Sequence, residues 1–181
     1  ALLAGALLAL SACATQDDPT PGSPSPQAAI PPIDRAAPER TETATLPSVD
    51  LGTDSRFGSL PGVVRTRVGY AGGSTPDPTY NSIGDHSESV QVDYDPTQIT
   101  YQELLEAFWA GHNPRQPTFS PQYASLIFYH DEEQRQIAEQ SRADQAAQGG
   151  PISTELRPAG EFTWAEDYHQ KYFLRGRRDL L

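Results

Sequence analysis

The sequence predicts an α+β fold, because strand-like and helix-like patterns follow one another without strict βαβ alternation. Residues 62–73 and 88–96 alternate apolar and polar side chains, as half-buried strands do. Residues 100–112 instead place apolar side chains three and four positions apart, as an amphipathic helix does. The chain has 181 residues, which is enough for one domain with a hydrophobic core.

The two alternating segments are expected to be neighbouring strands. The first, at 62–73, is rich in β-branched valine and ends in a Gly-Gly pair, which favours a turn. In the second, Val90, Val92 and Tyr94 fall on one face, and Asp95-Pro96 ends the strand. One face of each strand is therefore expected to be buried.

The remaining elements follow in order along the chain. Thr100 and Glu103 form a capping box at the start of the first helix. Its apolar stripe consists of Leu104, Leu105, Phe108 and Trp109. Residues 124–130 predict a buried strand, and residues 131–150 a solvent-facing helix with acids in its first turn and glycines at its end. Residues 151–166 predict a strand and its exit.

Composition limits the functions that the chain can have. The formal net charge is −11, so nucleic acid is not an expected partner, because phosphate binding needs basic patches. No apolar run is long enough for an ordinary transmembrane helix. The single cysteine, Cys13, excludes an internal disulfide.

The N-terminal region predicts export and a lipid anchor. Residues 1–13 are an apolar run that ends in small residues, typical of a signal peptide, and the chain contains no Met, so we expect a longer precursor. Leu10-Ser11-Ala12-Cys13 resembles a bacterial lipobox, which implies cleavage before Cys13 and acylation of its thiol; the alternative is an ordinary signal peptide with a chance cysteine. Residues 14–45 are proline-rich and predict a disordered tether. The folded domain is expected at 46–181.

Six motifs succeed one another in this domain: GYAGG, TPDPTY, GDHSESVQVDYDP, ELLEAFWAGHNP, QYASLIFYH and AEDYHQKYFLR. In this order and at these spacings they resemble peptide methionine sulfoxide reductase of the A type, over about residues 56–175. The resemblance implies a two-layer α/β plait, with helices packed on a mixed sheet. It also implies thiol-dependent reduction of the S epimer of methionine sulfoxide, free or in proteins, without metal, flavin or nicotinamide.

The resemblance also assigns the site residues. In the family, a cysteine thiolate attacks the sulfoxide sulfur, a buried carboxylic acid protonates the oxygen, and phenols hold that oxygen. The acid corresponds to Glu88, and the phenols correspond to Tyr80 and Tyr123. Without the resemblance, Glu88 would be interpreted as a solvated charge at a strand edge, and the tyrosines as half-buried core residues.

Other polar residues are expected to have structural roles. His86, His112 and His169 match no compact ligand spacing, so no metal site is predicted. His112 and His169 are interpreted as partners of loop backbone or of the acids in AEDYH. Many family members carry an acid shortly before the QY tyrosine, whereas Thr118 stands near that place here.

The main departure from the family lies at the nucleophile. The register places Ser48-Val49-Asp50-Leu51-Gly52 on the family motif Gly-Cys-Phe-Trp-Gly. Val49 therefore replaces the nucleophilic cysteine, and Asp50 and Leu51 replace the aromatic pair that holds the methyl group. Cys13 is a poor substitute, because acylation would block its thiol.

Three interpretations of this departure remain open. The chain is a degenerate reductase, a binding module for methionine sulfoxide or oxidised envelope proteins, or the product of a short frame slip in the gene reading. In each case we expect a monomer that is lipid-anchored to a bacterial envelope membrane, with its domain in the periplasm or outside the cell. An active form would need an external thiol donor such as a thioredoxin-like protein.

Overall fold

The computed structural model describes residues 39–48, 52–117 and 120–171. Its elements, in chain order, are β1 (Glu42–Pro47), α1 (Thr53–Gly58), β2 (Val63–Ala71), β3 (Ser87–Tyr94), α2 (Tyr101–Ala110), the 3₁₀ turn η1 (Pro121–Tyr123), β4 (Leu126–Tyr129), α3 (Glu132–Gly149), β5 (Glu155–Pro158) and β6 (Phe162–Trp164). Cys13, Val49, Asp50, Leu51 and Thr118 lie outside the described residues, so the predictions for these positions remain predictions.

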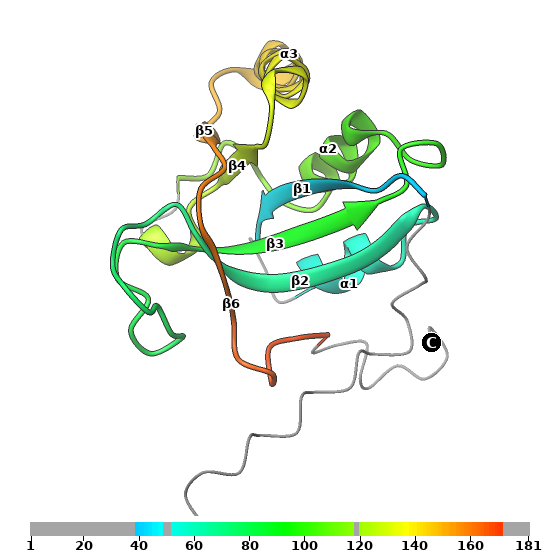
Figure 1. The fold of residues 1–181 in the computed structure, drawn as a ribbon. Helices are drawn as coiled ribbons and strands as arrows, with labels where there is room; N and C mark the ends of the chain where they lie inside the picture. The colour runs from blue at the N-terminus through cyan, green and yellow to red at the C-terminus, as the bar shows by residue number, and fades with distance from the viewer. Residues whose placement is uncertain (1–38, 49–51, 118–119, 172–181) are drawn as a thin grey trace, which may run out of the picture.

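The described strands form one mixed sheet in the order β5-β4-β1-β3-β2-β6. β4 and β5 pair in parallel, and the other neighbours pair antiparallel. Figure 1 shows α1 and α2 behind the central strands and α3 beyond β4 and β5. The predicted α+β class is confirmed.

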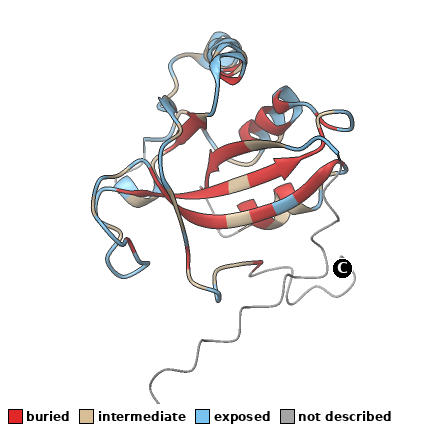
Figure 2. Cartoon of the chain, viewed as in Figure 1, coloured by how far each residue is buried: buried red, intermediate tan, exposed pale blue. Residues whose placement is uncertain are grey.

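The core lies on one face of the three central strands. Leu46 of β1 and Val68 of β2 both pair with Val90 of β3, so their side chains share this face. Phe57 of α1 and Leu104 of α2 pack against the same row, and all five side chains are buried. Figure 2 shows the resulting band of burial along the sheet.

β1 begins earlier than the sequence suggested. The predicted boundary between tether and domain, at residues 45 and 46, falls within this strand, which starts at Glu42. Thr43 and Thr45 alternate with the fully buried Ala44 and Leu46. β1 is hydrogen-bonded to β3 on one side and to β4 on the other, so pairing orders a segment whose composition is tether-like.

The two long helices, α2 (Tyr101–Ala110) and α3 (Glu132–Gly149), are capped at their N-termini and hydrogen-bonded to each other. Thr100 and Glu103 form both bonds of the capping box at α2. The side chain of Asp131 caps α3 by accepting a hydrogen bond from the backbone N–H of Gln134 at 2.8 Å. The Trp109 indole donates to the Ser141 hydroxyl at 2.7 Å and thereby joins α2 to α3.

The predicted single strand within residues 151–166 is wrong, because the segment forms two strands. β5 pairs with β4 and β6 pairs with β2, at opposite edges of the sheet. Pro158 ends β5, and the chain crosses to the other edge before Phe162. Among the described residues, no helix is long and apolar enough to cross a bilayer.

Candidate functional site

Glu88 is buried because of its place in β3. Side chains alternate across a strand, so Glu88 shares the core face with Val90 and Val92. Its exposed fraction is 6%, close to that of its apolar neighbours. The interpretation of Glu88 as a solvated strand-edge charge is therefore wrong, and the buried acid that the family resemblance implies is present.

Ser48 and Gln122 contact this carboxylate from two sides. The Ser48 hydroxyl donates to Glu88 Oε1 at 3.3 Å, and the Gln122 amide donates to Oε2 at 3.5 Å. Both distances are long for such bonds, so the carboxylate is held loosely by these two groups. The Ser48 amide also donates to the Glu88 carbonyl at 2.9 Å, which carries the pairing of β1 and β3 one residue further.

The two predicted phenols lie on separate loops that meet near Glu88. Tyr123 ends η1, and the Ser87 hydroxyl ties this turn to the start of β3 by donating to the Pro121 carbonyl at 2.7 Å. Burial, a hydrogen bond with Tyr80 and the charges of Tyr80 and Glu88 raise the pKa of the Tyr123 phenol. Tyr123 thus interacts with both other predicted residues, and Tyr80 is 37% and Tyr123 40% exposed, whereas Glu88 is buried.

Tyr70 and Glu166 belong to the same cluster and were not predicted as site residues. Tyr70 of β2 pairs directly with Glu88 of β3, so the two side chains share one face. The Tyr70 hydroxyl donates to Glu166 Oε2 at 2.8 Å, and the Tyr80 amide donates to Oε1 at 3.0 Å. Burial, the bond to Glu166 and the charges of Glu166 and Glu88 raise the pKa of Tyr70. Strand periodicity could have identified Tyr70, because it lies two residues beyond Val68.

The histidines have structural contacts. His86 Nε2 lies 2.9 Å from the Thr75 carbonyl, and His112 Nδ1 lies 3.0 Å from the Phe108 carbonyl. The His169 ring packs on the Tyr80 ring with centroids 4.5 Å apart. In the described part of the chain, no group of three or more His, Cys, Asp or Glu side chains could hold a metal ion.

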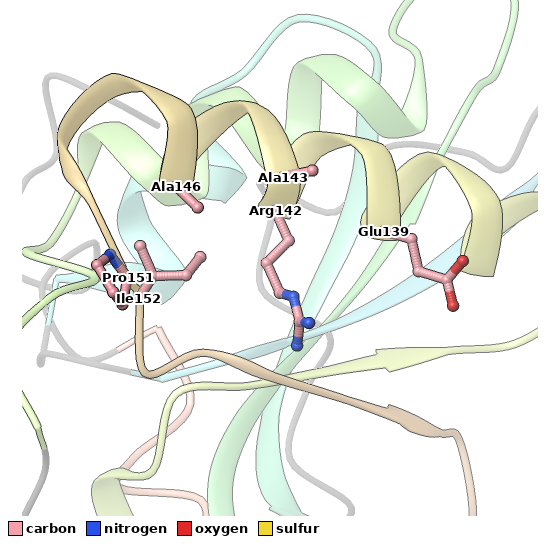
Figure 3. Close-up of a pocket in the computed structure, with 6 residues that line it drawn as sticks. All are labelled: Glu139, Arg142, Ala143, Ala146, Pro151 and Ile152. Atoms are coloured by element: carbon pink, nitrogen blue, oxygen red, sulfur yellow. The ribbon is translucent and has the colours of Figure 1, made fainter.

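One cavity lies apart from this cluster. It has a volume of about 320 Å³ and lies between α3 and the Pro151-Ile152 segment (Figure 3). Glu139, Arg142, Ala143 and Ala146 of α3 line it together with that segment. None of the predicted site residues lines it.

The comparisons with known proteins identify the family. A family model described as peptide methionine sulfoxide reductase matches residues 51–179 of this chain. The chain belongs to the peptide methionine sulfoxide reductase A family. Within this family model, Glu88, Tyr80 and Tyr123 all lie in the matched region, whereas Val49 precedes its first matched residue.

Several methionine sulfoxide reductases resemble the chain. It is 49% identical to "Peptide methionine sulfoxide reductase" of Drosophila melanogaster over 132 residues, which cover 71% of this chain and 54% of that protein. It is 43% identical to the reductase MsrA of Methanococcoides burtonii over 134 residues, which cover 67% of this chain and 88% of that protein. The chain thus spans about half of the fly protein, and 61% of "Peptide methionine sulfoxide reductase A5" of Oryza sativa.

Solved reductase structures share the fold. Methionine sulfoxide reductase A of Corynebacterium diphtheriae superimposes with a TM-score of 0.66 at 37% identity and covers 76% of each chain. Reduced Mxr1 of Saccharomyces cerevisiae gives a TM-score of 0.70 at 27% identity and covers 80% of this chain and 90% of that one. These likenesses confirm the predicted mixed sheet with packed helices.

Proposed function

We propose that this domain recognises methionine S-sulfoxide in oxidised proteins or peptides through Glu88, Tyr80 and Tyr123. The observation that carries the proposal is the buried Glu88 carboxyl beside two partly exposed phenols. The sulfoxide oxygen is a strong hydrogen-bond acceptor, so it suits a site that offers phenol hydroxyls as donors. Family membership supports this choice of ligand over other polar groups.

The family reaction needs a nucleophile as well as this polar site. A thiolate attacks the sulfoxide sulfur, the acid protonates the oxygen, and methionine leaves as the thiol becomes a sulfenic acid. A second thiol then condenses with the sulfenic acid, which releases water and leaves a disulfide. Valine at position 49 cannot make the first attack, and residues 46–181 contain no cysteine. We therefore expect this chain to bind the sulfoxide without reducing it.

Calorimetric titration of the full chain with a methionine S-sulfoxide peptide tests the proposal. The R-sulfoxide and unoxidised peptides serve as controls, and reduction is followed in parallel with dithiothreitol. We expect saturable binding of the S epimer, weaker binding of both controls, and no turnover. Equal affinity for all three peptides would refute the recognition site, and turnover would refute the assignment of position 49.

An active form of the domain would need an external reductant. We propose a thioredoxin-like donor, because the domain offers no second cysteine to resolve the sulfenic acid. Mxr1 of Saccharomyces cerevisiae has been solved in complex with Trx2, which shows that a related fold accepts such a partner. Pull-down of the full chain with a thioredoxin locked by a Cys→Ser change in its resolving cysteine tests this pairing after a cysteine is restored at position 49.

We further propose that acylated Cys13 anchors the chain to a bacterial envelope membrane, with the segment predicted at 14–45, up to the start of β1 at Glu42, as the tether. The support is the Leu-Ser-Ala-Cys run followed by proline-rich sequence. The protein expressed with a complete signal should partition into detergent and carry acyl mass on Cys13. Equal membrane association of the Cys13→Ser variant would contradict the proposal.

A further inference from the structure

The segment after β6 forms a fixed platform beside the candidate site. The Ala165 amide donates to the Val68 carbonyl at 3.0 Å. The Gln170 side chain accepts from the Val68 amide at 3.0 Å and donates to the Val68 carbonyl at 2.8 Å. Residues 165–170 are thus joined to β2 at both ends of the segment, and Glu166 lies between these attachments.

Glu166 connects two elements of the site from this platform. One carboxylate oxygen accepts from the buried Tyr70 hydroxyl and the other from the Tyr80 amide, at 2.8 and 3.0 Å. Tyr70 belongs to β2 within the sheet, whereas Tyr80 lies on the loop between β2 and β3. A carboxylate has acceptors on two oxygens, so one side chain can hold both donors at once.

The contact between Tyr80 and Tyr123 depends on where this loop lies. The Tyr80 ring packs on His169, three residues after Glu166 in the same segment. Its phenol interacts with the Tyr123 phenol, whose pKa the charge of Glu88 also raises. Glu166 therefore fixes the backbone of Tyr80, and His169 packs against the Tyr80 ring. Together these two contacts set the position of the Tyr80 hydroxyl.

We propose that Glu166 is a positioning residue, which fixes the Tyr80 loop to β2 so that the Tyr80 phenol meets Tyr123 over Glu88. Glu166 acts through Tyr80 and touches no ligand itself. The role depends on the reach of the side chain and on its two terminal hydrogen-bonding atoms rather than on its charge. The proposal deepens the proposed function, on which its ligand-binding consequence rests.

Three substitutions separate reach from charge. Glu166→Gln keeps the length: its carbonyl accepts from the Tyr80 amide, and its NH₂ donates to the Tyr70 oxygen. Glu166→Asp keeps the charge but is one methylene shorter, so it cannot hold both partners. Glu166→Ala removes both bonds. Asp167→Ala, an exposed acid at the next position, is the matched control.

The first readout needs no ligand. Tyrosine labelled with ¹³C at Cζ reports each phenol titration by NMR, and Tyr123→Phe assigns the Tyr123 signal. We expect the raised pKa of Tyr123 to persist in Glu166→Gln and Asp167→Ala and to fall toward the ordinary value in Glu166→Asp and Glu166→Ala. If the alanine variant does not fold, the comparison of Gln with Asp still decides.

The second readout is binding of the methionine S-sulfoxide peptide to the full-length chain. We expect Glu166→Asp and Glu166→Ala to weaken binding about tenfold and Glu166→Gln less than threefold, in line with the loss of positioned hydrogen bonds. A titration of Tyr123 that Asp leaves unchanged, or that only Gln alters, would overturn the role of Glu166. Lack of binding by the unaltered chain would instead overturn the proposed function, because the titration readout is independent of ligand.

Discussion

Ser48 and Glu88 are joined twice, by a backbone hydrogen bond of 2.9 Å and by a side-chain contact of 3.3 Å. Ser48 precedes Val49 in the sequence, on which the family resemblance places the nucleophile, and Glu88 is the residue to which that resemblance assigns the acid. The predicted acid is therefore tied to the residue that follows β1. We expect reduction to depend on residues 49 to 51, where the chain departs from the family motif.

Restoration of the family motif should restore turnover. Val49→Cys alone should recover little, because the neighbouring Asp50 carboxylate raises the pKa of the new thiol and fits poorly beside a methyl group. The triple change Val49→Cys, Asp50→Phe, Leu51→Trp should reduce a methionine S-sulfoxide peptide with dithiothreitol. Methionine formation, followed by chromatography, measures the rate. No turnover by a folded triple variant would show that these three changes are not sufficient for reduction.

Glu88 should separate binding from proton transfer. Its amide analogue can donate a hydrogen bond to the sulfoxide oxygen but cannot release a proton. Glu88→Gln should therefore bind the S-sulfoxide peptide nearly as well as the unaltered chain, whereas Glu88→Ala should lose about tenfold in affinity. In the background of the triple variant, Glu88→Gln should cost about 10²–10⁴-fold in turnover. Equal turnover of the Glu and Gln forms would exclude Glu88 as the general acid.

The pairing of β6 with β2 should require glycine at position 69. A Cβ atom at this position would lie 2.4 Å from the Thr163 carbonyl oxygen and equally close to the Phe162 ring. Backbone cannot move aside cheaply, so Gly69→Ala should lower the free energy of unfolding by about 1–3 kcal/mol. Gly160→Ala is the control, since its added Cβ would meet no atom within 4 Å. Urea denaturation measures the free energy of unfolding of both variants. Equal unfolding midpoints for Gly69→Ala and Gly160→Ala would contradict the close packing at Gly69.

The capping box of α2 predicts a pH dependence of stability. Hydrogen bonds from the Thr100 amide and hydroxyl lower the pKa of Glu103 from its ordinary 4.5. The unfolded chain then takes up the proton first, so the stability that Glu103 adds is complete above pH 4.5 and is lost as the pH falls through the folded pKa. Glu103→Gln keeps a capping acceptor without a titrating group. Denaturation between pH 7 and 3 should show a smaller acid-induced loss of unfolding free energy for Glu103→Gln than for the unaltered chain. Parallel pH profiles for the two proteins would refute the role of Glu103.

Local patterns predicted most of the sheet and both long helices. Alternation identified β2 and β3 and put Val90, Val92 and Tyr94 on one face, but without the family resemblance it left Glu88 as a solvated charge, which the structure buries. The Thr100–Glu103 pair fixed the start of α2, because both of its bonds are local in sequence. β1 was missed in part, although Ala44 and Leu46 alternate with threonines, since the surrounding proline-rich composition favoured a tether.

Local sequence patterns could not predict side-chain contacts between segments that are far apart in the chain. Tyr70 and Glu166 are 96 positions apart, and Ser48 and Glu88 are 40 apart. Each of these side chains looks ordinary within its own motif, and only the sheet register and the return of the chain after β6 bring them together. The resemblance to a family supplied Tyr80 and Tyr123, which periodicity alone would have left as core tyrosines.

The attachment of Gln170 to Val68 also bears on self-association. A strand at the margin of a sheet presents free peptide groups to which another molecule can add a strand. The Gln170 carboxamide offers one acceptor and one donor to Val68, as a peptide group of a neighbouring strand would. It therefore occupies the backbone of β2 just beyond the short β6, at a point where intermolecular strand addition and aggregation could otherwise begin.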